Sequence, residues 1–178
     1  MLNFTSHINQ DKKRLIIFII ALALILVIFR AYVFRTIDYR YTGVKYQVGN
    51  LGYGESVNIE IKGKYTIGLF SSFDEFDGKI IVGDKVFNYS NYVQQDNHFK
   101  KIPLTMETRD KNIYGDLFYN NVLKQITLPI REQEGSNRHS WSNKDGFVIS
   151  APSTNREQAI ELSNKLIPSQ YRNGNKLE

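Results

Sequence analysis

Side chains able to do chemistry are scattered along this chain, and none falls in a spacing typical of a metal site. Three histidines are present, of which His98 and His139 lie in polar stretches, QQDNHFKK and SNRHSW. A zinc site needs three or four ligands, commonly histidines or cysteines at short fixed spacings. The sequence has no such spacing and no cysteine. We therefore expect solvated loop histidines, no metal site, no disulfide and no cofactor.

The densest group of carboxylates is Asp74, Glu75 and Asp77. Paired carboxylates can hydrolyse glycosides or bind calcium, but these three directly precede Gly78, where we expect a solvated turn between strands. The serines beside His139 lack the G-x-S-x-G elbow that presents a nucleophile. The sequence therefore predicts no catalytic residue and a protein that is not an enzyme.

Residues 15–29 form an unbroken apolar run, LIIFIIALALILVIF. A helix of this run is about 22 Å long, whereas the hydrocarbon core of a bilayer is about 30 Å thick. Extension to Phe34 gives about 20 residues and places Arg30 near the interface, where its long side chain can reach outward. We expect a transmembrane helix over 15–34 that contacts the lipid bilayer, preceded by a short basic tail over 1–14. A cleaved signal peptide and a buried soluble helix are the alternatives.

The basic charge of the chain is concentrated around this apolar run. Residues 1–35 hold five basic residues and one acidic residue, so most of the net charge of +5 lies there. The remaining domain is almost neutral, which argues against nucleic acid as a partner. Basic residues are about equally frequent on the two sides of the run, so orientation stays open, with the domain outside the cytoplasm favoured.

From Ile37 onward the apolar period changes from helical to two, which is typical of antiparallel strands with one buried face. A turn is expected at Gly63-Lys64, and Pro129 suits an edge strand. Two stretches, 76–87 and 113–123, resemble hairpins with tight turns at Gly83-Asp84 and Asn120-Asn121. The expected strands are 37–41, 44–48, 57–61, 65–70, 102–106, 126–130 and 147–150.

One soluble helix follows the strands. Thr154 and Glu157 fit a capping box at its start and Pro168 ends it, and residues 169–178 are expected to form a polar tail. The expected fold class is α+β: a meandering antiparallel β-sheet domain over 36–168 with this C-terminal helix packed on it. A small β-sandwich or barrel is the alternative.

The loop over residues 132–145 contains the only tryptophan, and long loops in compact domains are often functional. We expect the chain to be a non-catalytic, membrane-tethered extracytoplasmic binding or assembly module of a bacterial cell envelope, with a protein partner. An envelope glycan-processing enzyme that uses carboxylates, or a membrane-bound regulator facing the cytoplasm, are the alternatives. The candidate partner-binding residues are Arg138, His139, Trp141, Tyr114 and Tyr119.

Overall fold

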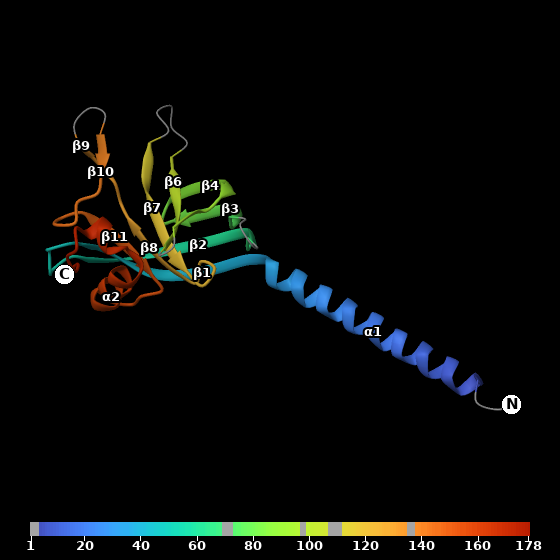
Figure 1. The fold of residues 1–178 in the computed structure, drawn as a ribbon. Coiled ribbons are helices and arrows are strands. Elements are labelled where there is room, and N and C mark those ends of the chain that lie inside the picture. The colour runs from blue at the N-terminus through green and yellow to red at the C-terminus, as the bar shows by residue number, and fades with distance from the viewer. Residues whose placement is uncertain (1–3, 69–72, 97–98, 107–111, 135–137) are drawn as a thin grey trace. The chain divides into compact units, whose positions relative to one another are not determined.

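The computed structural model describes residues 4–68, 73–96, 99–106, 112–134 and 138–178 (Figure 1). The chain divides into two compact units, Met1–Arg35 and Thr36–Glu178. The first unit is one helix, α1 (Phe4–Val33), so most of the expected basic tail is helical. Its large apolar side chains between residues 15 and 29 are 48% to 68% exposed. Within the described residues, no helix combines the length and the apolar character needed to cross a membrane.

The second unit is built on an antiparallel sheet, as the period-two pattern predicts. Over the described residues it has nine strands in the order β4-β3-β2-β1-β11-β8-β7-β6-β5, with a separate β10-β9 hairpin. The strands are β1 (Phe34–Gln47), β2 (Gly54–Thr66), β3 (Glu75–Val82), β4 (Lys85–Tyr92), β5 (Gln94–Asp96), β6 (Phe99–Thr105), β7 (Ile113–Asn120), β8 (Gln125–Pro129), β9 (Glu132–Glu134), β10 (Arg138–Ser140) and β11 (Phe147–Ala151).

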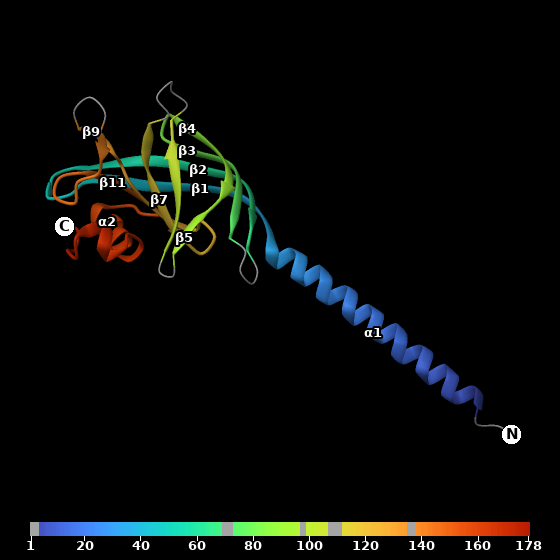
Figure 2. The same cartoon turned by 45° about the horizontal axis from the view of Figure 1, so that its top comes forward.

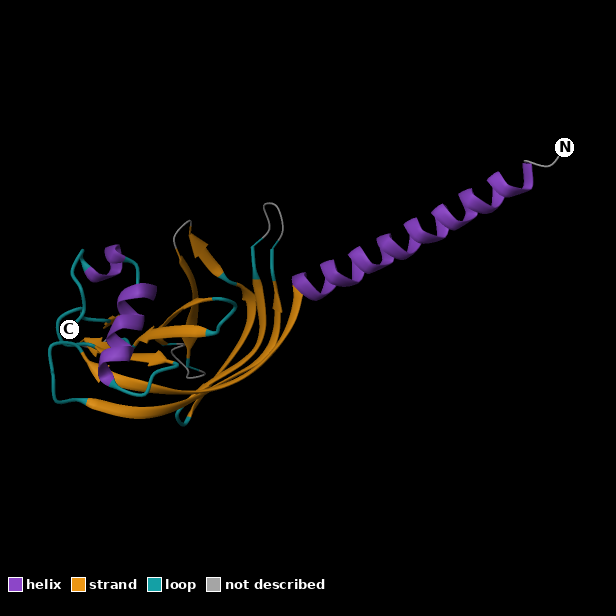
Figure 3. Cartoon of the chain, turned by 90° about the horizontal axis from the view of Figure 1, so that it is seen from below, coloured by secondary structure: helices purple, strands orange, loops and turns teal. Residues whose placement is uncertain are grey.

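The sheet curls into a nearly closed barrel (Figures 2 and 3), which agrees with the barrel alternative. The two ends of the strand order, β4 and β5, are separated only by Val93. This stretch of chain therefore pairs first with β3 and then with β6. Val93 is buried at the corner, and its N–H donates to the carbonyl oxygen of Asp74 at 2.8 Å.

Two apolar clusters stabilise this unit, one inside the barrel and one outside it. The inner cluster takes the alternate side chains of the strands, such as Ile59, Ile61, Ile80, Leu117 and Tyr119. The outer cluster lies between α2 (Arg156–Leu166) and the outward side chains of β1, β7 and β11, and comprises Val44, Tyr46, Val48, Phe118, Val148, Ala159, Leu162, Leu166, Ile167 and Leu177. The expected helix therefore packs on the sheet, against the outer face of the barrel.

Several local expectations were wrong. The chain does not turn at Gly63, because β2 continues through it and pairs Gly63 with Gly78 of β3. A Cβ on Gly63 would lie 2.3 Å from the carbonyl oxygen of Asp77, so the close approach of two backbones requires glycine there. Pro129 is in the interior strand β8, between β11 and β7, and not at an edge. It is the last residue of β8, and the next N–H, from Ile130, bonds to the Phe147 carbonyl at 2.9 Å.

The two predicted hairpins differ in outcome. The first is confirmed, with a two-residue turn that includes Gly83 at φ +62°. The second turns over residues 121–124, and Asn121, Val122 and Leu123 all have positive φ.

The C-terminal end of the chain also differs from expectation. The cap of α2 is Asn155, one residue after Thr154, and its side chain accepts from the N–H of Gln158. Residues 169–178 are not a loose tail. They include the short helix η1 (Ser169–Arg172) and bury Arg172 and Leu177.

Candidate functional site

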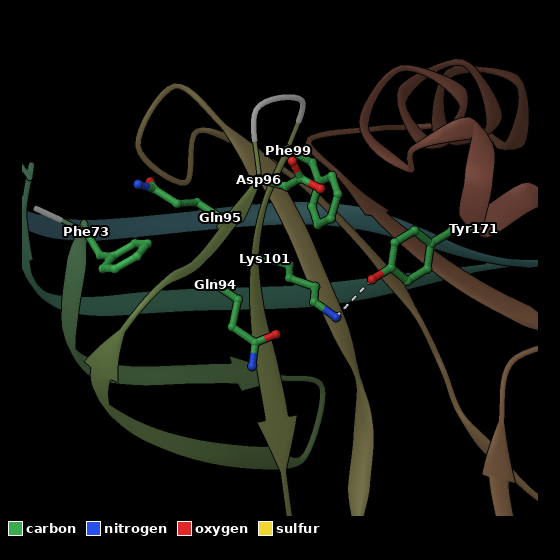
Figure 4. Close-up of a pocket in the computed structure, with 7 residues that line it drawn as sticks. All are labelled: Phe73, Gln94, Gln95, Asp96, Phe99, Lys101 and Tyr171. Carbon is green, nitrogen blue, oxygen red and sulfur yellow. Dashed lines mark hydrogen bonds between the residues drawn. The ribbon is translucent and has the colours of Figure 1, made fainter. Parts of the chain in front are cut away.

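Two pockets share Tyr171 of η1 and are here together called the groove. Figure 4 shows the residues that line the first of them. The first part, here called the wide lobe, encloses about 600 Å³ and is lined by Phe73, Gln94, Gln95, Asp96, Phe99, Lys101 and Tyr171. The second, here called the tryptophan pocket, encloses about 210 Å³ and is lined by Asp116, Phe118, Pro129, Arg131, Ser140, Trp141 and Tyr171.

The alternation of side chains along the strands determines which residues form the floor of this groove. On β7, Leu117 and Tyr119 point into the barrel, so Asp116 and Phe118 point outward. Lys101 of β6 pairs in register with Phe118, which brings its side chain to the same outer face.

Asp116 is a buried carboxylate with two cationic partners. Lys101 Nζ lies 3.3 Å from its Oδ1, and Arg131 Nη2 lies 2.5 Å from its Oδ2. Lys101 also donates to the Tyr171 hydroxyl oxygen at 3.1 Å. A buried carboxylate is tolerated when its charge is paired and hydrogen-bonded, and here two cations share one carboxylate. This part of the groove is therefore ordered, and the cluster of Lys101, Asp116 and Arg131 has one more positive than negative charge.

Aromatic rings form the walls. Tyr171 meets Phe118 and Phe99 edge-on, with ring centroids 5.1 and 5.7 Å apart. Trp141 packs on Gly146, where an added Cβ would lie 2.8 Å from the indole. The indole Nε1 is buried and has no hydrogen-bond partner among the described residues. Both Trp141 and Tyr171 are half-buried, so each holds a fixed place while still lining the groove.

The five candidate partner-binding residues do not form one surface. Trp141 lines the groove, and Arg138 and His139 lie in the adjacent β10, where their side chains are outside the described part. Tyr119 fills the barrel interior, and its hydroxyl is 2.7 Å from that of Tyr65. Tyr114 stacks on Phe87 of β4 at 5.2 Å, because it is the extra residue of a bulge in β7.

The expectation of a solvated turn at residues 74–77 was wrong for Asp74. Its carboxylate is buried and accepts from the Tyr65 hydroxyl at 2.5 Å, the Gly68 N–H at 2.9 Å and the Lys100 ammonium. Burial acts to raise the pKa of Asp74, but the hydrogen bonds from Lys100, Tyr65 and Gly68 outweigh it, and the pKa lies below its ordinary value. Burial also raises the pKa of Tyr119.

Glu75 and Asp77 are exposed, as expected, but the predicted turn is wrong for them too, because both lie in β3 and pair with β2 and β4. His98 lies outside the described residues. Within the described part of the chain, no three His, Cys, Asp or Glu side chains are placed to hold a metal ion.

Lys101, Asp116, Arg131 and Tyr171 were missed by the sequence analysis. One signal was present: Asp116 interrupts IYGDLFY, a strand that is otherwise apolar on both faces. A carboxylate in such a strand needs a cationic partner, and both partners lie fifteen residues away along the chain.

Compared with protein-family models, curated proteins and solved structures, the chain matches none of them. The candidate site therefore has to be interpreted from its own geometry. It offers a preformed groove with aromatic walls and a floor of paired charges, which is suited to holding a partner in a defined orientation.

Proposed function

We propose that this chain is a membrane-tethered binding module of a bacterial cell envelope, whose groove receives part of a protein partner outside the cytoplasm. The observation that carries the proposal is the composition of the groove. Trp141, Tyr171 and Arg131 line one pocket, and Trp, Tyr and Arg are the residue types that dominate binding energy in protein interfaces.

Rigidity also supports binding through this groove. Tyr171 is held by the Lys101 hydrogen bond and by two aromatic neighbours, and Trp141 is held by its contact with Gly146. Rings already fixed in place lose little conformational entropy when a partner binds. The pocket therefore provides anchoring contacts at a low ordering cost.

A binding test follows from this composition. Trp141→Ala together with Tyr171→Ala should abolish cross-linking of the full-length chain to its partner in detergent-solubilised membranes. Leu51→Ala is a matched control, because Leu51 is the most exposed large apolar side chain of the domain and lies in the β1–β2 turn. Retention of the same cross-linked product by the double variant would overturn the groove as the binding surface.

The tether is proposed from the apolar surface of α1. Thirteen residues between 15 and 29 are Leu, Ile, Phe or Val, which contribute about −0.3 to −0.6 kcal/mol each on the insertion scale. Their sum exceeds the cost of about 3 kcal/mol for one arginine such as Arg30. The proposed span, 15–34, also includes Ala31 and Tyr32, whose side chains are outside the described part.

A fractionation experiment tests the tether. The full-length protein should sediment with membranes and resist alkaline carbonate, whereas Leu22→Arg combined with Ile25→Arg should release it. Protease added to intact spheroplasts should digest the domain if it faces outward. Extraction of the unchanged chain by carbonate would overturn the tether, and protection from protease would place the domain on the cytoplasmic side.

A further inference from the structure

The polar side chains of the tryptophan pocket offer more unused hydrogen-bond donors than unused acceptors. Both oxygens of Asp116 already accept hydrogen bonds, one from Lys101 and one from Arg131. Arg131 uses Nη2 in that contact, and its other guanidinium N–H groups have no partner among the described residues. The Tyr171 oxygen accepts from Lys101, so its own proton can be donated.

Apart from Ser140, the rest of the pocket is apolar. Phe118, Pro129 and the Trp141 ring line it, and its volume of about 210 Å³ is that of about seven water molecules at ~30 Å³ each. A short aliphatic stem can lie against these walls while a polar head reaches Arg131. A carboxylate has two acceptor oxygens, whereas a neutral amide keeps one and replaces the other with an NH₂ group that would face the donors of the pocket.

We infer that the tryptophan pocket takes a carboxylate side chain of the protein partner, with Arg131 and the Tyr171 hydroxyl donating to it and Trp141 packing on its methylene groups. Charge supports this occupant, because two cations face the single carboxylate of Asp116. Arginine favours carboxylates through parallel N–H donors. The inference rests on the proposed function, since it names the chemistry that the same groove recognises.

The chain contains one tryptophan, so selectively excited tryptophan fluorescence monitors this pocket alone. We would titrate the full-length protein in non-ionic detergent with N-acetylglutamate N-methylamide, with the matching glutamine derivative, and with inorganic phosphate. The glutamate derivative should give a saturable change and the glutamine derivative none. Arg131→Gln should weaken the response about 10- to 100-fold, as expected for loss of a hydrogen bond to a charged group.

Two variants separate binding from folding. Arg40→Gln removes the same charge from an exposed pair with Glu60 on β1 and β2, and should leave the titration unchanged. Tyr171→Phe keeps the ring and removes the hydroxyl, with both its proton and the oxygen that accepts from Lys101, so it should weaken the response even if Arg131→Gln does not fold.

Three results would overturn the inference: equal responses to the glutamate and glutamine derivatives, no response to either, or a tighter response to phosphate. If one of these occurs while the Trp141 and Tyr171 double variant still loses its partner, the groove remains the binding surface and only the carboxylate is wrong. If the double variant keeps its partner, the proposed function itself fails.

Discussion

Asp74→Asn is the substitution that tests the barrel corner most directly. The change keeps the size of the side chain but removes its charge and replaces one acceptor oxygen with an NH₂ donor. Three donors converge on the native carboxylate, from Tyr65, Gly68 and Lys100. One amide oxygen cannot serve all of them, so at least one donor at the corner loses its acceptor.

The expected loss of stability lies between that of a single hydrogen bond to a charged group and that of a fully buried ion pair. A hydrogen bond to a charged group contributes about 1.5–3 kcal/mol, and breaking a fully buried ion pair costs about 3–5 kcal/mol. The Lys100 side chain is 41% exposed, so it regains water when its partner is removed, and the cost falls below the buried limit. We expect Asp74→Asn to lower the free energy of unfolding by about 2–3 kcal/mol at neutral pH.

The pH dependence follows from the lowered pKa of Asp74. A carboxyl whose folded pKa lies below its unfolded value, about 3.9, contributes its full stabilisation above that value. The contribution is lost as the pH falls through the folded pKa. Urea unfolding followed by Trp141 fluorescence should therefore show the wild-type advantage over Asp74→Asn shrinking below about pH 4.

The matched control is Asp84→Asn. Its side chain is 91% exposed in the β3–β4 turn, so the free energy of unfolding should change by less than about 0.5 kcal/mol. The reasoning fails if Asp74→Asn is as stable as the wild type at neutral pH, or if the advantage of the wild type over Asp74→Asn does not shrink in acid.

Three further predictions concern packing and titration. Gly63→Ala should lower the free energy of unfolding in urea by about 3 kcal/mol, because the new methyl group would overlap the backbone of β3. Gly52→Ala is the control and should be tolerated, because a Cβ there meets nothing closer than 3.8 Å. Equal stability of the two variants would contradict the close pairing of Gly63 with β3. Leu166→Ala should cost about 2–5 kcal/mol, because it empties a buried position between α2 and the sheet; an unchanged melting temperature would mean that α2 is not packed there. Burial raises the pKa of Tyr46 to about 12, so Tyr46 should ionise after the exposed tyrosines in an alkaline absorbance titration. Its contribution to stability is complete below about pH 10 and is lost as the pH rises through 12. Ionisation of Tyr46 together with the exposed tyrosines would show that it is not buried.

The strands were predictable because one face of each packs into the barrel, which imposes alternation on the sequence. The first hairpin was predictable because Gly83 sits where a two-residue turn needs positive φ. The turn predicted at Gly63 was wrong, because a Gly-Lys pair is typical of a turn when only the neighbouring residues are considered. The role of Gly63 depends on Gly78, which lies opposite only in the correct register.

The site was less predictable, because its contacts join different strands. Asp74 has partners 6, 9 and 26 residues away, and a local stretch of carboxylates gives no sign of them. The ion pairs around Asp116 join β6, β7 and the segment that follows β8, so their spacing has meaning only once the strand order is known. The joining of the two halves of the sheet likewise depends on β1 pairing with β11, as in Val44 with Ser150.

The pairing of β1 with β11 also determines the order in which the chain can fold. The strands β2 to β4 and β6 to β8 are joined by hairpins and can form locally, within microseconds. The edge of β1 at residues 44–47 has to wait for residues 147–150, which are synthesised long after it. Pairing across such a distance is slow, and an apolar edge left open is prone to aggregate. We therefore expect the pairing of β1 with β11 to be the rate-limiting step of folding.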